Sequence, residues 1–126
     1  MRIGLMSVIK VGAFVAAGPG FAQNPHEVEE GQKIFKRVCF TCHTADAGKN
    51  KIGPSLFGVV GRKAGSVPGF ASSNAMKESG VTWDDQALDK YLTEPKTFIP
   101  GNRMPYAEVK KEDERKDVIA YLDSLR

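Results

Sequence analysis

The sequence predicts an all-α domain of three or four helices joined by unusually long loops. Apolar residues recur at helical spacing near both ends of residues 23–126, whereas no segment alternates apolar and polar residues over the length of a strand. Between these ends glycine and proline are frequent, above all in residues 44–71, and they prevent a long regular element there. Because so long a loop is unusual in a compact domain, we expect it to wrap around something.

The first predicted helix covers residues 27–38, and a short helix covers residues 72–79. Three glutamates occupy the first turn of the longer one, where the helix dipole favours negative charge. Its apolar face carries Val28, Gly31, Phe35 and Val38.

Two further helices are predicted in the second half of the chain. Thr82 is the expected N-cap of the first, because an acidic residue follows three positions later, and Pro95 ends it. Residues 96–111 are predicted to form a loop. The last helix begins at about Glu112, and its inner stripe consists of Val118, Tyr121, Leu122 and Leu125.

Residues 1–22 have the layout of a cleaved secretory signal peptide. Arg2 and Lys10 carry positive charge, and residues 11–17 form a short apolar run. Gly20 and Ala22 place small residues at the two positions that a signal peptidase reads for a cut after Ala22. A retained membrane anchor is the alternative, but it needs roughly 20 uninterrupted apolar residues, and Lys10 interrupts the stretch. We therefore expect residues 23–126 to form one domain in the periplasm, without stable insertion into a membrane.

The charge of that domain excludes a strongly basic binding protein. The whole chain has a formal net charge of +3, and removal of Arg2 and Lys10 leaves 16 basic and 15 acidic residues. We expect no binding to nucleic acid, because that depends on many unpaired basic residues. Recognition by charge must then come from a local patch, and we expect the protein to be a monomer.

Both cysteines and one of the two histidines fall in the segment Cys39-Phe-Thr-Cys-His43. Cys-x-x-Cys followed by His is typical of c-type haem attachment. Two thiols three residues apart at the end of a helix can bond to the two vinyl groups of a porphyrin, so that Cys39 and Cys42 bind haem c. His43 is then the expected ligand of the haem iron.

Three other interpretations of the two cysteines remain open. A redox dithiol of the thioredoxin kind occurs in a β-α-β context, which is not predicted here. A structural zinc site needs four ligands, and only the distant His26 could join Cys39, Cys42 and His43. A plain disulfide suits an exported protein, but it leaves His43 and the long loops without a role.

A haem iron bound by His43 has a sixth position, for which the sequence offers Met76, Met104 and His26. Met104 lies between a Pro-Gly pair and a further proline. Proline fixes the backbone and glycine allows it to approach a flat ring closely. We therefore favour Met104, although a methionine is more often a core residue than a ligand.

Short motifs follow one another in a single order between residues 31 and 122. They are Gly31-Gln-Lys-Ile-Phe35, Cys39 to His43, Gly53-Pro54-Ser-Leu56, Gly61-Arg62-Lys63, Pro68-Gly69-Phe70, Val81-Thr82-Trp83, Tyr91-Leu92, Pro95-Lys96, Ile99-Pro100-Gly101, Met104 and Ile119-Ala120-Tyr121-Leu122. Through them the chain resembles class I cytochrome c, specifically the mitochondrial protein and its small bacterial relatives. The resemblance implies that fold, wrapped around one covalent haem c.

The resemblance also implies roles for residues around the iron. Met104 is the axial ligand opposite His43. The carbonyl of Pro54 accepts a hydrogen bond from the free ring nitrogen of His43, as a metal-bound imidazole requires. Tyr91 lies in the pocket near Met104.

Further implied roles concern the haem propionates and the crossing of the terminal helices. Arg62 and Trp83 help to satisfy the propionates, which are costly to bury unpaired. Ser72 replaces a tyrosine that contacts a propionate in the mitochondrial protein, and Asn102 replaces a threonine two positions before the ligand methionine. Near the termini, Gly31 and Phe35 pack against Tyr121.

With His43 and Met104 on the iron, no position is vacant for a substrate. We therefore expect a one-electron carrier rather than an enzyme. The alternative is a haem peroxidase or gas sensor that opens when Met104 leaves the iron.

Seven basic residues flank the motifs and, by the resemblance, ring the exposed haem edge where redox partners dock. A cytochrome bc-type complex, a terminal oxidase, a photosynthetic reaction centre and a periplasmic dehydrogenase all suit such a carrier. The seven residues are Lys33, Lys49, Lys51, Lys96, Arg103, Lys110 and Lys111.

Overall fold

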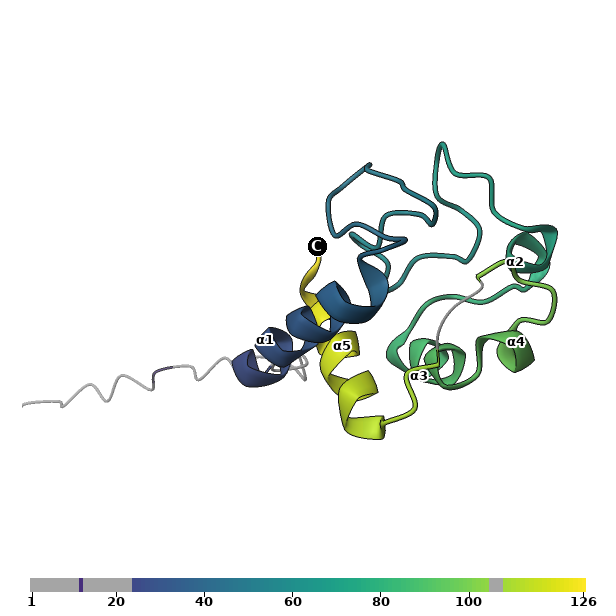
Figure 1. Cartoon of the computed structure of the whole chain (residues 1–126). Helices are drawn as coiled ribbons and strands as arrows, with labels where there is room; N and C mark the ends of the chain where they lie inside the picture. Colours follow the sequence, from purple (N-terminus) through teal and green to yellow (C-terminus); the bar gives the residue numbers. More distant parts are fainter. Residues whose placement is uncertain (1–11, 13–23, 105–107) are drawn as a thin grey trace, which may run out of the picture.

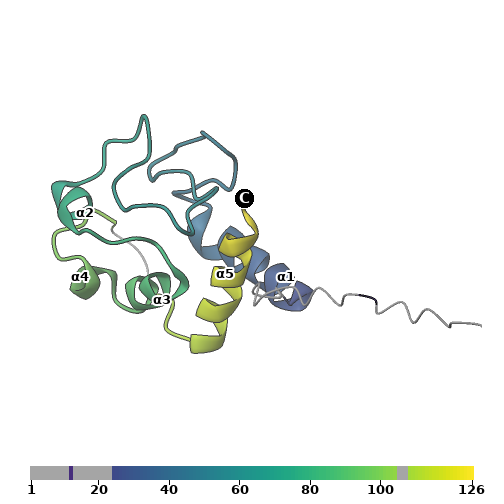
Figure 2. The same ribbon diagram turned by 180° about the vertical axis from the view of Figure 1, so that it is seen from behind.

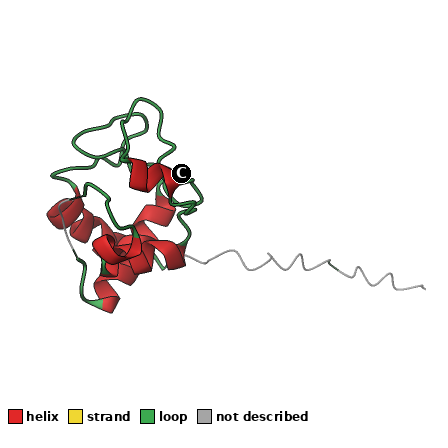
Figure 3. Ribbon diagram, turned by 90° about the vertical axis from the view of Figure 1, so that its right-hand side faces the viewer, coloured by secondary structure: helices red, strands yellow, loops and turns green. Residues whose placement is uncertain are grey.

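A computed structural model describes Gly12, residues 24–104 and residues 108–126. Apart from Gly12, the predicted signal segment lies outside the described residues. Within them the regular structure is all helical, as predicted (Figure 3). The one pairing of extended backbone in these residues is an isolated bridge between Lys63 and Thr82. The elements are α1 (Pro25–Ile34), η1 (Phe35–Cys39), α2 (Asn74–Glu78), α3 (Asp85–Thr93), α4 (Pro95–Phe98) and α5 (Glu112–Ser124) (Figure 1).

The first predicted helix is present as α1 followed by η1. It begins two residues earlier than expected, because the Asn24 side chain caps it by accepting the His26 N–H at 3.0 Å, and Pro25 takes the first helical position. After Ile34 the helix widens into a π-turn, in which the Phe40 N–H donates to the Phe35 carbonyl at 2.9 Å.

Helices α1 and α5 lie side by side, as both front and back views show (Figures 1 and 2), and their backbones come closest at Gly31. A Cβ at Gly31 would overlap the backbone carbonyl of Asp117 and come within 2.8 Å of the Tyr121 Cβ. Only glycine therefore permits this approach. One turn further along, the rings of Phe35 and Tyr121 pack with centroids 5.4 Å apart, so the expected helix contact is present.

The structure corrects two predictions in the second half of the chain. The N-cap of α3 is Asp84, whose carboxylate accepts the Ala87 N–H at 2.7 Å, and not Thr82. Thr82 instead pairs with Lys63 in the bridge. Pro95 follows the end of α3 as predicted, but it also begins the short helix α4 inside a segment predicted to be a loop.

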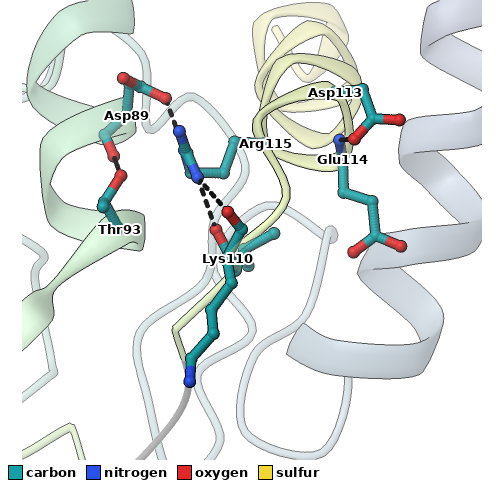
Figure 4. Close-up of polar contacts among 7 residues, drawn as sticks. Asp89, Thr93, Lys110, Asp113, Glu114 and Arg115 are labelled. Carbon is teal, nitrogen blue, oxygen red and sulfur yellow. Dashed lines mark hydrogen bonds and ion pairs between the residues drawn. The ribbon is translucent and has the colours of Figure 1, made fainter.

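Arg115 fixes α5 to the rest of the molecule. Its side chain leaves α5 and reaches between α3 and the segment that leads into α5 (Figure 4). The guanidinium Nε lies 2.7 Å from Asp89 Oδ1, and Nη1 donates to the carbonyls of Val109 and Lys110 at 3.0 and 2.9 Å. Arg115 is only 9% exposed. An arginine is rarely buried to this extent unless its charge is paired, as it is here.

Candidate functional site

The end of the first helix presents both thiols and the imidazole to one cavity. After the π-turn, the N–H groups of Cys42 and His43 both donate to the Cys39 carbonyl, at 3.1 and 2.9 Å. This single helical turn places Cys39, Cys42 and His43 along the wall of a cavity of about 420 Å³. Met104, more than 60 residues later in the sequence, lines the same cavity.

The chemistry of the two cysteines disfavours a redox dithiol. The two cysteines are not bonded to each other, and burial, followed by the neighbouring Cys42, raises the pKa of the Cys39 thiol to about 11. A reactive dithiol instead requires a lowered pKa, because the thiolate is the nucleophile. Across residues 24–104 and 108–126, no three His, Cys, Asp or Glu side chains group as a metal site would need, so the zinc interpretation has no support.

Two neighbours determine the state of His43. Its Nδ1 lies 2.7 Å from the Pro54 carbonyl. A carbonyl can only accept, so Nδ1 carries the proton and Nε2 keeps the lone pair that a metal needs. Burial lowers the pKa of His43 against the opposing effect of the Pro54 bond, and the positive charges of Arg62 and Lys51 lower it further. The neutral, ligating form is therefore favoured.

Gly53 leaves room for the imidazole. A Cβ at this position would lie 2.7 Å from His43 Nδ1 and 2.9 Å from Nε2, closer than any side chain tolerates. The backbone N–H of Gly53 donates to the Cys42 carbonyl at 2.7 Å. This bond holds the loop against residues 39–43 and the ring of His43 against Gly53.

Met104 lies in a polar network with Tyr91 and Asn102. The Tyr91 hydroxyl is 3.5 Å from Met104 Sδ and 3.4 Å from Asn102 Oδ1. Burial raises the pKa of Tyr91 to about 12, so the hydroxyl keeps its proton and remains a donor. The network points a hydrogen-bond donor at the thioether of Met104.

The other candidate ligands lie differently. Met76 lines the cavity too, from α2. His26 is exposed in the first turn of α1 and is not among the residues that line the cavity. The structure therefore brings two methionines, but not His26, to the cavity that holds His43.

Arg62, Ser72 and Trp83 also line the cavity. The guanidinium of Arg62 donates to the carbonyls of Ser55 and Phe57 at 3.0 and 3.3 Å, and burial lowers its pKa. Trp83 is 7% exposed and packs on Tyr91 with ring centroids 5.0 Å apart. Together they place polar groups in a wall that is otherwise largely apolar.

All seven basic residues predicted to surround the docking edge are exposed. Arg103 lines the cavity and donates to the Ala71 carbonyl at 2.6 Å. Lys51 lies over the Phe40 ring, 4.2 Å from its centroid, and precedes Ile52, an exposed residue of the cavity wall. Three others pair with nearby acids, in the pairs Lys33–Glu30, Lys49–Asp46 and Lys110–Glu108.

The lining of the cavity fits a covalently held haem. Two thiols lie in its wall beside an imidazole with a free Nε2 lone pair, and the thioether of Met104 lines the same cavity. Leu56, Val59, Leu88 and Leu122 supply apolar surface for a flat ring, and cofactor cavities typically have this mixture of apolar walls and few polar groups.

In the part of the chain that the structure describes, no helix combines the length and the apolar character that crossing a bilayer requires.

Comparison with known proteins identifies close relatives. The family described as Cytochrome c matches residues 28–126. Cytochrome c2 iso-2 of Magnetospirillum molischianum is 53% identical over 89 residues, which cover 71% of this chain and 92% of that protein. Cytochrome c type-1 of Ascaris suum is 47% identical over 97 residues, covering 77% and 87%. Cytochrome c2 of Rhodopila globiformis is 42% identical over 102 residues, covering 81% and 96%.

Proposed function

This chain belongs to the cytochrome c family and is an electron carrier with covalently bound haem c, and we propose that His43 and Met104 are the axial ligands of its iron. The observation that supports the assignment most directly is that both side chains line one cavity together with Cys39 and Cys42. Thioether bonds from Cys39 and Cys42 would hold the haem.

The bound haem c supplies a one-electron couple, in which iron alternates between Fe(II) and Fe(III). The protein's own residues would hold both proposed ligands in place. Burial favours the neutral form of His43, and the Pro54 carbonyl holds its ring in one orientation. The Tyr91 hydroxyl restrains Met104 from the other side. An electron carrier benefits from such restraint, because little has to move when charge changes.

Arg62 and Trp83 are proposed to meet the haem propionates, since both lie in the cavity wall. Arg62 is already bonded to two backbone carbonyls, which fixes its charge in place. Ser72 lines the cavity where the mitochondrial protein has a tyrosine, so a shorter hydroxyl is available there.

The carrier exchanges electrons with redox complexes. We infer that it does so in the periplasm, because residues 1–22 have the layout of a cleaved signal and two relatives are bacterial cytochromes c2. A mass that corresponds to residues 23–126 plus haem would support cleavage after Ala22. A bc-type complex, a terminal oxidase, a reaction centre and a dehydrogenase are the proposed classes of partner.

The axial assignment is tested by replacing each methionine of the cavity. Met104→Ala in the haem-loaded protein is expected to abolish the weak methionine–Fe(III) charge-transfer band and to give a high-spin form that readily binds external ligands. Met76→Ala is the matched control and should keep the band. If Met76→Ala loses the band and Met104→Ala keeps it, the assignment of Met104 is wrong.

The peroxidase or gas-sensor alternative requires Met104 to leave the iron. The relatives named above are cytochromes c and c2, which supports the carrier instead.

A further inference from the structure

Asn102 makes four hydrogen bonds around Met104. Its Nδ2 donates to the carbonyls of Pro95 and Ile99 at 2.9 and 2.8 Å. Its Oδ1 accepts the backbone N–H of Met104 at 2.9 Å and the Tyr91 hydroxyl at 3.4 Å. A primary amide offers two donors and two acceptor lone pairs, and both ends of this side chain are engaged. The single Tyr91 proton is shared between Asn102 Oδ1 and Met104 Sδ.

These bonds connect the backbone of Met104 to α3 and to both ends of α4. Pro95 is the first residue of α4, Ile99 is the residue that follows that helix, and Tyr91 belongs to α3. Movement of Met104 away from the cavity would break the bond to its N–H or pull Asn102 off both carbonyls. Each of those groups would then be left unpaired in a half-buried place, which is the costly part of losing a hydrogen bond.

We propose that Asn102 is a positioning residue that holds Met104 in the cavity and so restricts the access of small external ligands, such as imidazole, to the iron. The proposal rests on Met104 being the axial ligand. An external ligand can bind only when Met104 has moved away. Its apparent affinity is therefore proportional to the fraction of molecules in which the loop is open.

The role is specific to the asparagine. The resemblance places a threonine at this position, whereas the asparagine found here bonds to Pro95, Ile99, Met104 and Tyr91. A threonine has one hydroxyl and cannot satisfy two carbonyls while it also accepts the Met104 N–H. The asparagine thus holds the loop through more hydrogen bonds than a threonine could make there.

The experiment is a titration of the ferric, haem-loaded protein with imidazole, followed by its absorption spectrum. Asn102→Ala is expected to raise the apparent imidazole affinity about tenfold or more, since even one net hydrogen bond changes an equilibrium by several-fold to about tenfold. Asn102→Asp should also raise it, because a carboxylate oxygen replaces the Nδ2 donor that faces two carbonyls. It serves as the second variant should the alanine protein fold poorly.

Asn50→Ala is the matched control. The Asn50 side chain accepts the Ser55 N–H at 2.9 Å and donates to the Pro68 carbonyl at 3.3 Å, in the loop that follows His43. The Asn50→Ala protein therefore loses comparable hydrogen bonds at a place away from Met104. Its imidazole affinity should stay within about twofold of the parent protein's. An equal rise in Asn50→Ala would overturn the proposal, because the effect would be a general loosening.

A second measurement needs no substitution. Hydrogen exchange at the Met104 amide should be much slower than at the exposed Gly101 amide. The reason is that Asn102 Oδ1 accepts a hydrogen bond from the Met104 N–H. Equal rates would overturn the proposal. Absence of the methionine–Fe(III) band in the unsubstituted protein would refute the axial assignment itself. A different result would separate the two proposals. If the unsubstituted protein shows the band but both Asn102 variants keep the parent's imidazole affinity, the axial assignment stands and the role of Asn102 is refuted.

Discussion

His43 depends on two neighbours that act in different ways. Pro54 supplies an acceptor that fixes the position of the ring proton, and Gly53 supplies the space in which the ring lies. The sequence indicated the first role through the resemblance. It did not indicate the second, because a glycine in a glycine-rich loop gives no sign of what lies against it.

We predict that Gly53→Ala displaces His43. The added Cβ would be 2.7 Å from Nδ1, so the ring must shift and its bond to Pro54 must lengthen. We expect a loss of about 1–3 kcal/mol in the free energy of unfolding, as for other overpacked sites, together with a weakened methionine–Fe(III) band. Denaturant titration and the absorption spectrum of the holoprotein measure the two effects.

Gly80→Ala is the control for this substitution. No atom lies within 4 Å of a Cβ at Gly80, although its φ of +68° carries a backbone cost of its own. We therefore expect a stability loss without a spectral change. A normal band in Gly53→Ala would show that His43 tolerates the methyl group.

The hydrogen-bond partners of Asn102 could not be predicted from the sequence. Its place near the ligand followed from its spacing to Met104, but its partners Pro95 and Ile99 belong to α4 and its end. That helix was predicted to be a loop, since Pro95 was interpreted only as a stop signal. Proline also suits the first turn of a helix. Pro95 has both roles here, because it follows the end of α3 and is the first residue of α4.

At the scale of elements, the prediction that Thr82 is the N-cap of α3 was wrong for a related reason. Thr82 and Asp84 both have capping side chains, and sequence spacing alone could not separate them. The backbone of Thr82 is engaged with Lys63, and the Trp83 N–H donates to the Arg62 carbonyl at 2.9 Å. The helix can therefore begin only after this bridge, at Asp84.

Arg115 was missed, although the sequence carries a signal for it. It stands three residues before Val118 and seven before Leu122, so it lies on the inner stripe of α5 and not on its solvent face. A charge on an apolar stripe needs partners. The structure supplies Asp89 and the carbonyls of Val109 and Lys110.

We predict that Arg115→Met destabilises the protein by about 1–3 kcal/mol, because two backbone carbonyls lose their donor. Asp89→Asn should cost less than about 1 kcal/mol, since the Asp89 side chain is 48% exposed and the pair is screened by water. Urea unfolding of both holoproteins gives the comparison. A cost for Asp89→Asn as large as that for Arg115→Met would mean that the ion pair dominates.

The contact between α3 and α5 is expected to depend on pH. Burial, followed by a hydrogen bond with Asp85, raises the pKa of Asp123 from 3.8 to about 6, while Arg126 opposes the shift. The folded state therefore holds a proton that the unfolded state releases, and its stabilising effect is present below about pH 4 and lost as the pH rises through about 6.

Substitution of Asp123 by asparagine isolates this effect. Between pH 4 and pH 6 the parent should lose stability relative to Asp123→Asn, by about 1 kcal/mol after allowance for solvent screening. Unfolding free energies of the two proteins at several pH values provide the measurement. A constant difference over this interval would contradict the assignment.

At the scale of the whole molecule, the charge is nearly balanced once residues 1–22 are removed, so steering must be local. Arg103 lines the cavity and Lys51 stands beside its exposed wall residue Ile52. We predict that electron transfer to an acidic partner slows several-fold between about 0.01 and 0.2 M salt, where the Debye length falls from about 30 to below 10 Å.

Charge-removing variants refine that prediction. Lys51→Gln and Arg103→Gln should flatten the dependence of the rate on salt, which stopped-flow kinetics can follow. Lys116→Gln serves as the control, because Lys116 pairs with Glu27 on α1 at 3.2 Å and is outside the predicted docking set. Rates that do not vary with salt in the parent protein would refute local steering.

The crossing of α1 and α5 at Gly31 also has a consequence for the order of biosynthesis. The two helices are separated by nearly 80 residues of sequence, and each covers the apolar face of the other. A growing chain that lacks α5 leaves Phe35 without Tyr121, and closing so distant a pair is slow. We therefore expect Cys39 and Cys42 to emerge and to remain accessible to haem before the domain closes.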